Sequence, residues 1–292
     1  MLDQESIGVE RADGSFGYNK RICYMKFIGY LLLTGAIWVV CCTALTAQSD
    51  FLFSDRFEEL TIIAGSSHLN DTGIDWCATG SDTNLPCPQS GFPAQDGDVG
   101  RDALARHGAL QKEGQGTGGF DFTKLDRNGN EVSHTASNWS CVRDNHTGLI
   151  WEVKSDDVGD LRYYGHTYTW FSNDFDSNGG VPGIQAGGQC NGSRCDTEGY
   201  VEEINSQGLC GYDDWQLPTR MQLISIRHFG NVSQGVDDDY FPMNNQSRWW
   251  SNSVYGGDAD EAWSIRFSES DGLAISHPKL DALGIRLVHG GK

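Results

Sequence analysis

The spacing of three oxygen-bearing side chains is that of a calcium-binding loop. Asp174, Asp176 and Asn178 alternate with other residues, and a glycine follows directly. Oxygens at the first, third and fifth positions can wrap a hard cation. The twelfth position holds Gln185, where an EF-hand needs a bidentate glutamate. The pattern therefore predicts either a calcium site outside the EF-hand class or a plain polar turn, and no other cofactor.

A pair of adjacent tryptophans is the best candidate for ligand contact. Trp249 and Trp250 are followed closely by Asn252 and Tyr255. Aromatic faces can stack on sugar rings, and a nearby amide can exchange hydrogen bonds with hydroxyl groups. Large aromatic side chains also fill protein cores. Two interpretations stay open: core packing of one or both tryptophans, or a ligand-binding surface formed by these four residues.

No motif for catalysis is recognisable. The sequence contains no phosphate-binding loop, no HExxH motif and no CxxC pair. Its histidines are scattered and show no recognisable catalytic or metal-ligand spacing. Asp213 and Asp214 are better explained as loop caps than as acid–base catalysts. Triads need not be local in sequence, so the absence of a local motif is compatible with catalysis. We nevertheless expect a protein that is not an enzyme and that holds no zinc.

The cysteine content predicts an exported protein with three disulfide bonds. Nine cysteines occur in the chain, three of them within the first 47 residues, which leaves six. An even number in an exported chain is typical of a disulfide framework, although six cysteines allow fifteen pairings. The short separations favour Cys77–Cys87 and Cys190–Cys195 as local loops. Cys141–Cys210 then remains as the long-range bond.

Two helices and several short strands should position these residues. Thr219 with Gln222 three residues later is a capping-box pattern, which predicts a helix over 221–229. An earlier helix should begin at Asp196 or Thr197 and end at Gln207. Strands are expected over 120–125, 148–153, 263–267 and 285–288, and an irregular segment over 76–119. This order predicts a loop-rich α+β domain in which two helices pack on short antiparallel strands.

The segment before the second helix contains one large anchoring side chain. Pro218 restricts Leu217 to extended geometry. Alternate residues of an extended segment share a face, so Trp215 and Leu217 should turn to the same side. We expect both side chains to be buried under the second helix.

Several segments, in order, resemble the Lcl C-terminal domain family, which was first named at the C-terminus of a bacterial collagen-like adhesin. They are residues 139–154 (WSCVRDNHTGLIWEVK), 208–226 (GLCGYDDWQLPTRMQLISI), 249–253 (WWSNS), 262–267 (AWSIRF) and 284–291 (GIRLVHGG), with a lead-in at 100–102 and 122–130. The resemblance spans roughly residues 72–291. It implies a surface or periplasmic module of binding type and no reaction.

A more distant similarity concerns the fold. The DWQLPT turn is similar to the GYRLPT turn of formylglycine-generating enzymes, and the terminal GIRLV is similar to their closing strand. Both similarities imply a C-type-lectin-like fold, and fold analogy carries no function. The copper-binding cysteine pair expected near the C-terminus of those enzymes is missing, because the last cysteine is Cys210.

The charge of the chain disfavours polyanionic partners. Its formal net charge is −19, and the first 47 residues, with four acids and four bases, contribute none of it. Nucleic-acid binding needs clustered lysines and arginines, so no nucleic-acid partner is expected. Gln216 and His289 also stand where members of the resembling family often carry arginine. These departures weaken any transfer of the sulfated-polysaccharide binding associated with the adhesin domain.

The N-terminus has the pattern of a secretory signal. Residues 27–47 form the only long apolar run, basic residues precede it, and small residues at its end offer a cleavage site. A start at Met25 would give a signal peptide of ordinary length, 25–47; an uncleaved anchor is the alternative. The predicted division is a leader over 1–47, a linker over 48–75, an irregular part over 76–135 and an Lcl C-terminal-like domain over 136–292.

Three functions follow, in order of preference. The first is an exported, adhesin-like, non-catalytic module that binds extracellular glycan or a surface protein. It would be periplasmic, at the cell surface or extracellular, without a membrane span in its mature form. The second is a structural subunit of a surface filament or envelope assembly, which allows a homo-oligomer. The third is a formylglycine-generating-like enzyme.

Overall fold

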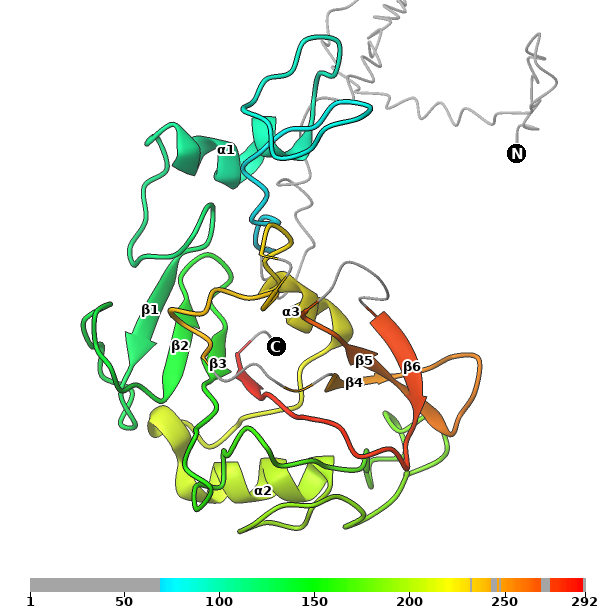
Figure 1. Ribbon diagram of the computed structural model, residues 1–292. Coiled ribbons are helices and arrows are strands. Elements are labelled where there is room, and N and C mark those ends of the chain that lie inside the picture. Colours follow the sequence, from blue (N-terminus) through cyan, green and yellow to red (C-terminus); the bar gives the residue numbers. More distant parts are fainter. Residues whose placement is uncertain (1–68, 232, 243–245, 247, 269–273, 291–292) are drawn as a thin grey trace, which may run out of the picture. The chain divides into compact units, whose positions relative to one another are not determined.

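The computed structural model describes residues 69–231, 233–242, 246, 248–268 and 274–290 (Figure 1). The predicted leader and most of the predicted linker lie outside these residues. Within them, helices and antiparallel sheets occur together, joined by long irregular connections. The predicted α+β class, with few helices, short antiparallel strands and disulfides, is confirmed.

The strands of the described residues form two antiparallel sheets. The first has the order β1-β2-β3-β7 and contains β1 (Phe122–Leu125), β2 (Cys141–Asp144), β3 (Ile150–Glu152) and β7 (Val288–His289). The second has the order β4-β5-β6 and contains β4 (Trp249–Val254), β5 (Glu261–Ile265) and β6 (Ala274–Pro278). The terminal strand β7 therefore returns to the sheet formed at the start of the domain.

The two predicted helices are present. Helix α2 (Thr197–Gln207) begins after Asp196, whose side chain accepts a hydrogen bond from the Gly199 amide, and it ends at Gly208 in the left-handed conformation. Helix α3 (Arg220–Ser225) has the predicted capping box between Thr219 and Gln222. It ends earlier than predicted, because the amides of residues 228 and 229 donate to carbonyls outside the helix.

A further helix, α1 (Gly100–Arg106), lies in the segment that was predicted to be irregular. It has seven residues and no side-chain cap, so its sequence signal is weak. Its buried Asp102 accepts hydrogen bonds from the Gly73 and Gly119 amides at 2.7 and 2.6 Å. Burial, with the nearby Asp71 charge, raises the pKa of Asp102 to about 6. The Asp102 carboxylate thus links α1 by hydrogen bonds to Gly73, which precedes the helix, and to Gly119, which follows it.

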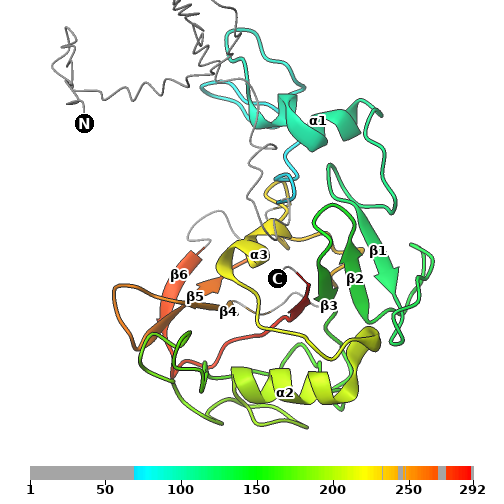
Figure 2. The same cartoon turned by 180° about the vertical axis from the view of Figure 1, so that it is seen from behind.

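Strand β3 and the first half of β4 are buried on both faces, and two hydrophobic cores lie against them. Successive strand residues point to opposite faces, so Trp151 enters one core and Ile150 enters the other. We call them the α3-side core and the α2-side core, after the helix that contributes to each. Figures 1 and 2 show α2 on the lower side of the sheets and α3 on the upper side, over β4 and β5.

Trp215 is buried as predicted, but its surroundings are different. It packs in the α2-side core, and its indole nitrogen donates to the Leu209 carbonyl at 3.0 Å. The side chain of Asn205 in α2 accepts from the Trp215 amide at 2.7 Å and donates to its carbonyl at 2.9 Å. The anchor therefore lies against α2, whereas the prediction placed it under the second helix, α3. The reason is that α3 directs Leu223 and Ile226 into the opposite core.

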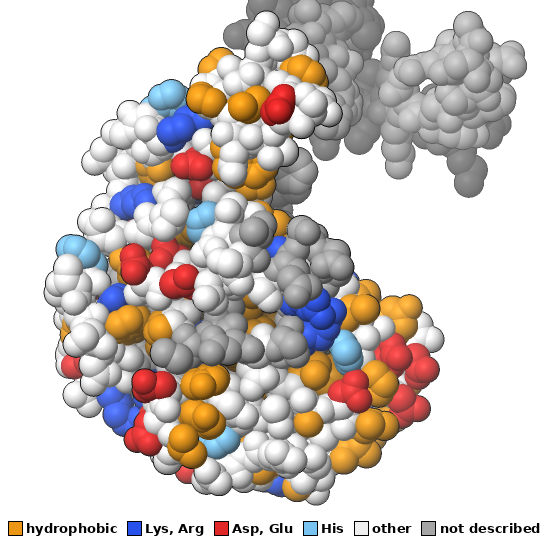
Figure 3. Space-filling view, viewed as in Figure 1, with side chains coloured by type: hydrophobic (Ala, Val, Ile, Leu, Met, Phe, Trp, Pro, Cys, Tyr) orange, Lys and Arg blue, Asp and Glu red, His pale blue; other side chains and the backbone are white. Residues whose placement is uncertain are grey.

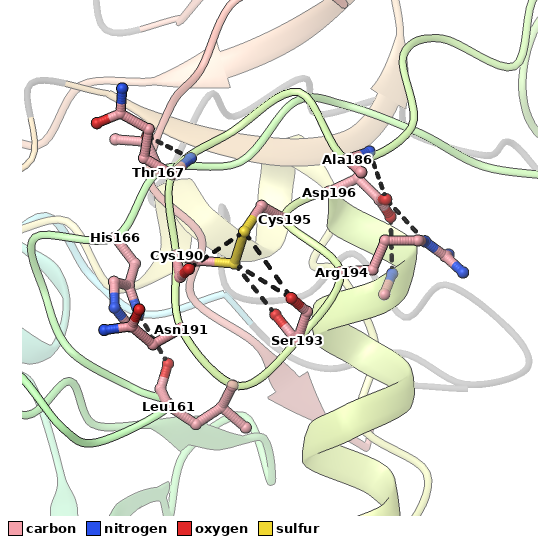
Figure 4. The surroundings of a disulfide bond; sticks show 12 residues. Leu161, His166, Thr167, Ala186, Cys190, Asn191, Ser193, Arg194, Cys195 and Asp196 are labelled. Carbon is pink, nitrogen blue, oxygen red and sulfur yellow. Dashed lines mark hydrogen bonds and ion pairs between the residues drawn. A yellow bond between two sulfur atoms is a disulfide. The ribbon is translucent and has the colours of Figure 1, made fainter.

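The predicted disulfide pairing is confirmed. Cys77 bonds with Cys87, Cys141 with Cys210 and Cys190 with Cys195. Figure 4 shows the last of these bonds closing a short loop immediately before α2. Bonds of this kind are typical of extracellular or exported proteins.

Candidate functional site

The adjacent tryptophans are core residues. Trp249 and Trp250 are both 0% exposed, with Trp249 in the α3-side core and Trp250 in the α2-side core. They point apart because they are neighbours in one strand, and each face of β4 is covered. The indole nitrogen of Trp250 donates to the Tyr168 carbonyl at 2.8 Å. The interpretation of these two side chains as a ligand surface is therefore wrong.

Asn252 and Tyr255, the other two residues of the predicted surface, remain accessible. Asn252 is exposed, and Tyr255 is half-buried beyond the end of β4. Tyr255 stands perpendicular to Trp263 with ring centroids 5.2 Å apart. The guanidinium of Arg220 lies 4.6 Å from the centroid of Trp263. An aromatic surface does exist here, but the half-buried Trp263 supplies its indole.

The predicted calcium residues form a hydrogen-bonded turn. Asp174 accepts from the Asp176 amide at 3.1 Å and from the Ser177 hydroxyl at 2.7 Å. The buried Asn178 donates to the Ser172 carbonyl at 3.1 Å and accepts from the Gly180 amide at 2.9 Å. The carboxylates of Asp174 and Asp176 are exposed. A cation would have to compete with the amide for the Asn178 oxygen, so calcium binding stays a prediction.

Replacement of Asp174 and Asp176 by alanine tests this prediction. An ion that binds only the folded state, at a hundredfold excess over its Kd, adds about 2.7 kcal/mol of stability. We expect calcium to raise the Tm of the unsubstituted protein and to leave that of the double variant unchanged. Asp258→Ala/Asp260→Ala is the matched control, because Asp258 accepts from the Asp260 amide in the same way, at 3.0 Å. If the unsubstituted protein has the same Tm in calcium and in chelator, calcium does not bind there and the segment is only a polar turn.

A buried ionic cluster joins β3 to α2 and to the C-terminal strand segment. Glu152 accepts from the Lys154 amine at 2.7 Å, from the Tyr200 hydroxyl and from the Leu287 amide at 2.8 Å. The Glu152 carbonyl accepts from Arg286 at 2.7 Å. Burial lowers the pKa of Lys154 to about 8 despite the attraction of Glu152. All five residues are enclosed, so the cluster cross-links the interior and offers a ligand no surface.

An open polar pocket of about 390 Å³ lies beside the start of β2. This volume is within the usual range for small-molecule sites, roughly 300–1,000 Å³. The lining contains one indole, three carboxylates, two guanidiniums, an amide and two hydroxyls: Trp139, Asp126, Asp157, Asp160, Arg127, Arg162, Asn138, Ser140 and Ser155. We call it the Trp139 pocket.

The indole of the pocket is held in one orientation. Its nitrogen donates to the Tyr240 carbonyl at 3.0 Å, and the Lys124 amine lies 3.5 Å from its ring centroid. Lys124 is itself fixed by donation to the Ala136 carbonyl at 3.1 Å. Trp139 is half-buried and packs in part against the α3-side core. A rigid aromatic side chain loses little entropy when a ligand contacts it.

The charged groups of the pocket are also fixed. Arg162 donates to Asp160 at 2.9 Å and to the Val153 carbonyl at 2.9 Å. Burial raises the pKa of Asp160, but hydrogen bonds from Arg162 and its charge outweigh burial and hold that pKa below its ordinary value. Hydrogen bonds from Asn130 likewise lower the pKa of Asp126. Three carboxylates against two guanidiniums give the lining a formal charge of −1.

The sequence pointed to the edge of this pocket and not to the pocket itself. Asp126, Asn128 and Asn130 show the spacing of a turn, and Asp126 does accept from both asparagine amides. Trp139 opens the first segment of the family resemblance. No local pattern in the sequence joins these residues to Arg162. They meet because β1 and β3 both pair with β2, and because Arg162 donates to the Ser140 and Val153 carbonyls.

Two further findings concern the described residues alone. No group of three or more histidine, cysteine, aspartate or glutamate side chains among them is arranged to hold a metal ion. No helix among them is both long and apolar enough to cross a membrane.

Comparison with known proteins agrees with the resemblance seen in the sequence. No curated protein and no solved structure matches the chain. The Lcl C-terminal domain family matches residues 140–289, just over half of the chain. This range is narrower than the one inferred from the motifs, and it contains α2, α3 and the strands from β2 to β7. The chain therefore belongs to the Lcl C-terminal domain family.

Proposed function

We propose that this chain is an exported, non-catalytic binding module of adhesin type that recognises an extracellular glycan in the Trp139 pocket. Membership of the Lcl C-terminal domain family supports a surface adhesin-like module. The observation that carries the glycan proposal is the lining of the pocket, where a fixed indole stands beside an amide, carboxylates and hydroxyls. Carboxylates and amides can bind sugar hydroxyl pairs, while an aromatic surface contacts the apolar face of a ring.

The charge of the pocket narrows the class of glycan. A lining with a net negative charge repels sulfate and carboxylate groups, whereas it accepts neutral or amine-bearing sugars. The net charge of −19 on the whole chain acts in the same direction. The preferred ligands are therefore uncharged or cationic saccharides. A C-type-lectin-like architecture is part of this proposal, and it rests on the similarity of the DWQLPT turn.

Two exposed residues allow a test that keeps the fold intact. Asn138 and Asp157 both line the pocket and are exposed, so replacing them with alanine should cost little stability. A glycan array with the secreted protein, with and without calcium, identifies a ligand, and titration calorimetry then measures its affinity. Because each lost hydrogen bond is worth about 0.5–1.5 kcal/mol, we expect Asn138→Ala/Asp157→Ala to weaken binding about tenfold or more.

Asn252→Ala/Asp258→Ala is the matched control, with one exposed amide in β4 and one exposed carboxylate in the connection from β4 to β5. If this control loses binding while the pocket variant retains it, the glycan binds at the aromatic surface formed by Tyr255, Trp263 and Arg220 and not in the Trp139 pocket. No binding to any glycan in either calcium condition contradicts the proposed function. Stable self-association without glycan binding, measured by light scattering, would favour a subunit of a surface filament or envelope assembly.

A further inference from the structure

Three large hydrophobic side chains are exposed where β6 ends. The exposed fractions are 75% for Phe175, 46% for Ile184 and 65% for Leu280. Figure 3 shows hydrophobic and acidic side chains gathered side by side on this part of the surface, at the lower right. We call these three residues the apolar patch. Exposed groups of large apolar side chains mark interaction sites more often than isolated ones do.

The two segments that carry the patch are fixed to one another. The amine of the buried Lys279 donates to the carbonyls of Asn178 and Val181, at 2.8 and 2.6 Å. The Trp170 amide donates to the Lys279 carbonyl, and the Ile184 amide donates to the Trp170 carbonyl, both at 3.0 Å. Residues 174–184 and residues 279–280 therefore lie side by side. The patch is presented on a bonded backbone and needs little ordering when a partner binds.

Carboxylates surround the patch. The exposed Asp174 and Asp176 flank Phe175 in the turn. The exposed Asp258 and Asp260 come from the connection between β4 and β5, and the carbonyl of Asp260 accepts from the Lys279 amide at 2.8 Å. We call these four residues the acidic rim. The lysine at its centre is buried and bonded to backbone carbonyls, so the charge that the rim offers a partner is negative.

We propose that the apolar patch and its acidic rim dock a basic, amphipathic protein segment. Apolar residues of that segment would cover Phe175, Ile184 and Leu280, and its lysines or arginines would meet the rim carboxylates. Charge complementarity selects this partner over a second copy of the chain. A symmetric dimer through the patch would place one acidic rim against another, which is repulsive. This surface is separate from the Trp139 pocket, so the inference does not depend on glycan binding.

A designed helical peptide of leucine and lysine, compared with a leucine–glutamate peptide of the same pattern, tests the proposal. Binding to the secreted protein is followed by fluorescence anisotropy. We expect the lysine peptide alone to bind, and Phe175→Ser/Leu280→Ser to weaken it at least tenfold. Val158→Ser/Met221→Ser is the matched control, because these residues are 61% and 47% exposed elsewhere and are expected to leave the affinity unchanged. Equal losses in both variants would overturn the proposal.

The charge requirement has its own control. Asp174→Asn/Asp176→Asn keeps the oxygen that accepts from the backbone and removes two charges of the rim. We expect this variant to weaken binding and to reduce its salt dependence, whereas Asp238→Asn/Asp239→Asn, at exposed positions elsewhere, changes neither. Equal binding of the glutamate peptide would overturn the proposal. So would a dimer of the protein alone that Phe175→Ser/Leu280→Ser abolishes.

Discussion

Replacing Trp215 with alanine is expected to unfold the domain or to prevent its secretion. The side chain is 2% exposed in the α2-side core, which also contains the Cys141–Cys210 bond, and its indole nitrogen donates to the carbonyl of the buried Leu209. Truncation of a buried tryptophan lowers the free energy of unfolding by about 3–5 kcal/mol. This is a large share of the total free energy of unfolding of most domains, which is roughly 5–15 kcal/mol. Urea unfolding, followed by far-ultraviolet circular dichroism, measures the loss.

Two comparisons separate anchoring from ligand contact. Tyr255→Ala removes a half-buried ring at the surface of the second sheet. We expect it to lower the free energy of unfolding by about 1 kcal/mol. Trp250→Ala should destabilise the protein about as strongly as Trp215→Ala, because Trp250 is also fully buried and hydrogen-bonded. A stable Trp215→Ala variant that had lost only ligand binding would move the functional surface to the DWQLPT turn.

Removal of the long-range disulfide is expected to have the second large effect. Cys141 and Cys210 are separated by 69 residues, and the chain-entropy model assigns such a loop roughly 4 kcal/mol. Cys190 and Cys195 are separated by only 5 residues, for which the same model gives about 2 kcal/mol. Cys141→Ala/Cys210→Ala should therefore lower the urea midpoint more than Cys190→Ala/Cys195→Ala does.

Packing increases this difference. Both sulfur atoms of the long-range bond are buried in the α2-side core, so their removal also opens space there. The short bond lies in a half-buried loop before α2 (Figure 4). Equal shifts of the urea midpoint in the two double variants would contradict the prediction that the long-range bond stabilises the domain more than the short bond does.

Local signals in the sequence determined where α2 and α3 begin, and they determined the disulfide pairing. The capping box of Thr219 and Gln222 and the cap at Asp196 are interactions between residues three positions apart, so each can be recognised without knowing the fold. The disulfide pairing followed from separation along the chain. Family membership followed from ordered motifs, and the match over residues 140–289 confirmed it.

Only the tertiary structure decided which aromatic residues are accessible. For Trp249 and Trp250 the sequence left core packing and a ligand surface both open. A different core covers each face of β4 at these positions, so both side chains are buried. Trp263, at the start of the predicted strand over 263–267, lies half-buried under the guanidinium of Arg220. Alternation along a strand tells which residues share a face, but it does not tell what covers that face.

The candidate sites depend on tertiary structure in the same way. The Trp139 pocket joins side chains from residues 126–162 through the pairing of β2 with β1 and β3 and through the bonds of Arg162 to the Ser140 and Val153 carbonyls. The apolar patch joins Phe175 to Leu280 through the bonds of one buried lysine. These contacts connect positions that are far apart in the chain. A single sequence records the residue types at those positions, and it holds no local signal for the distances between them.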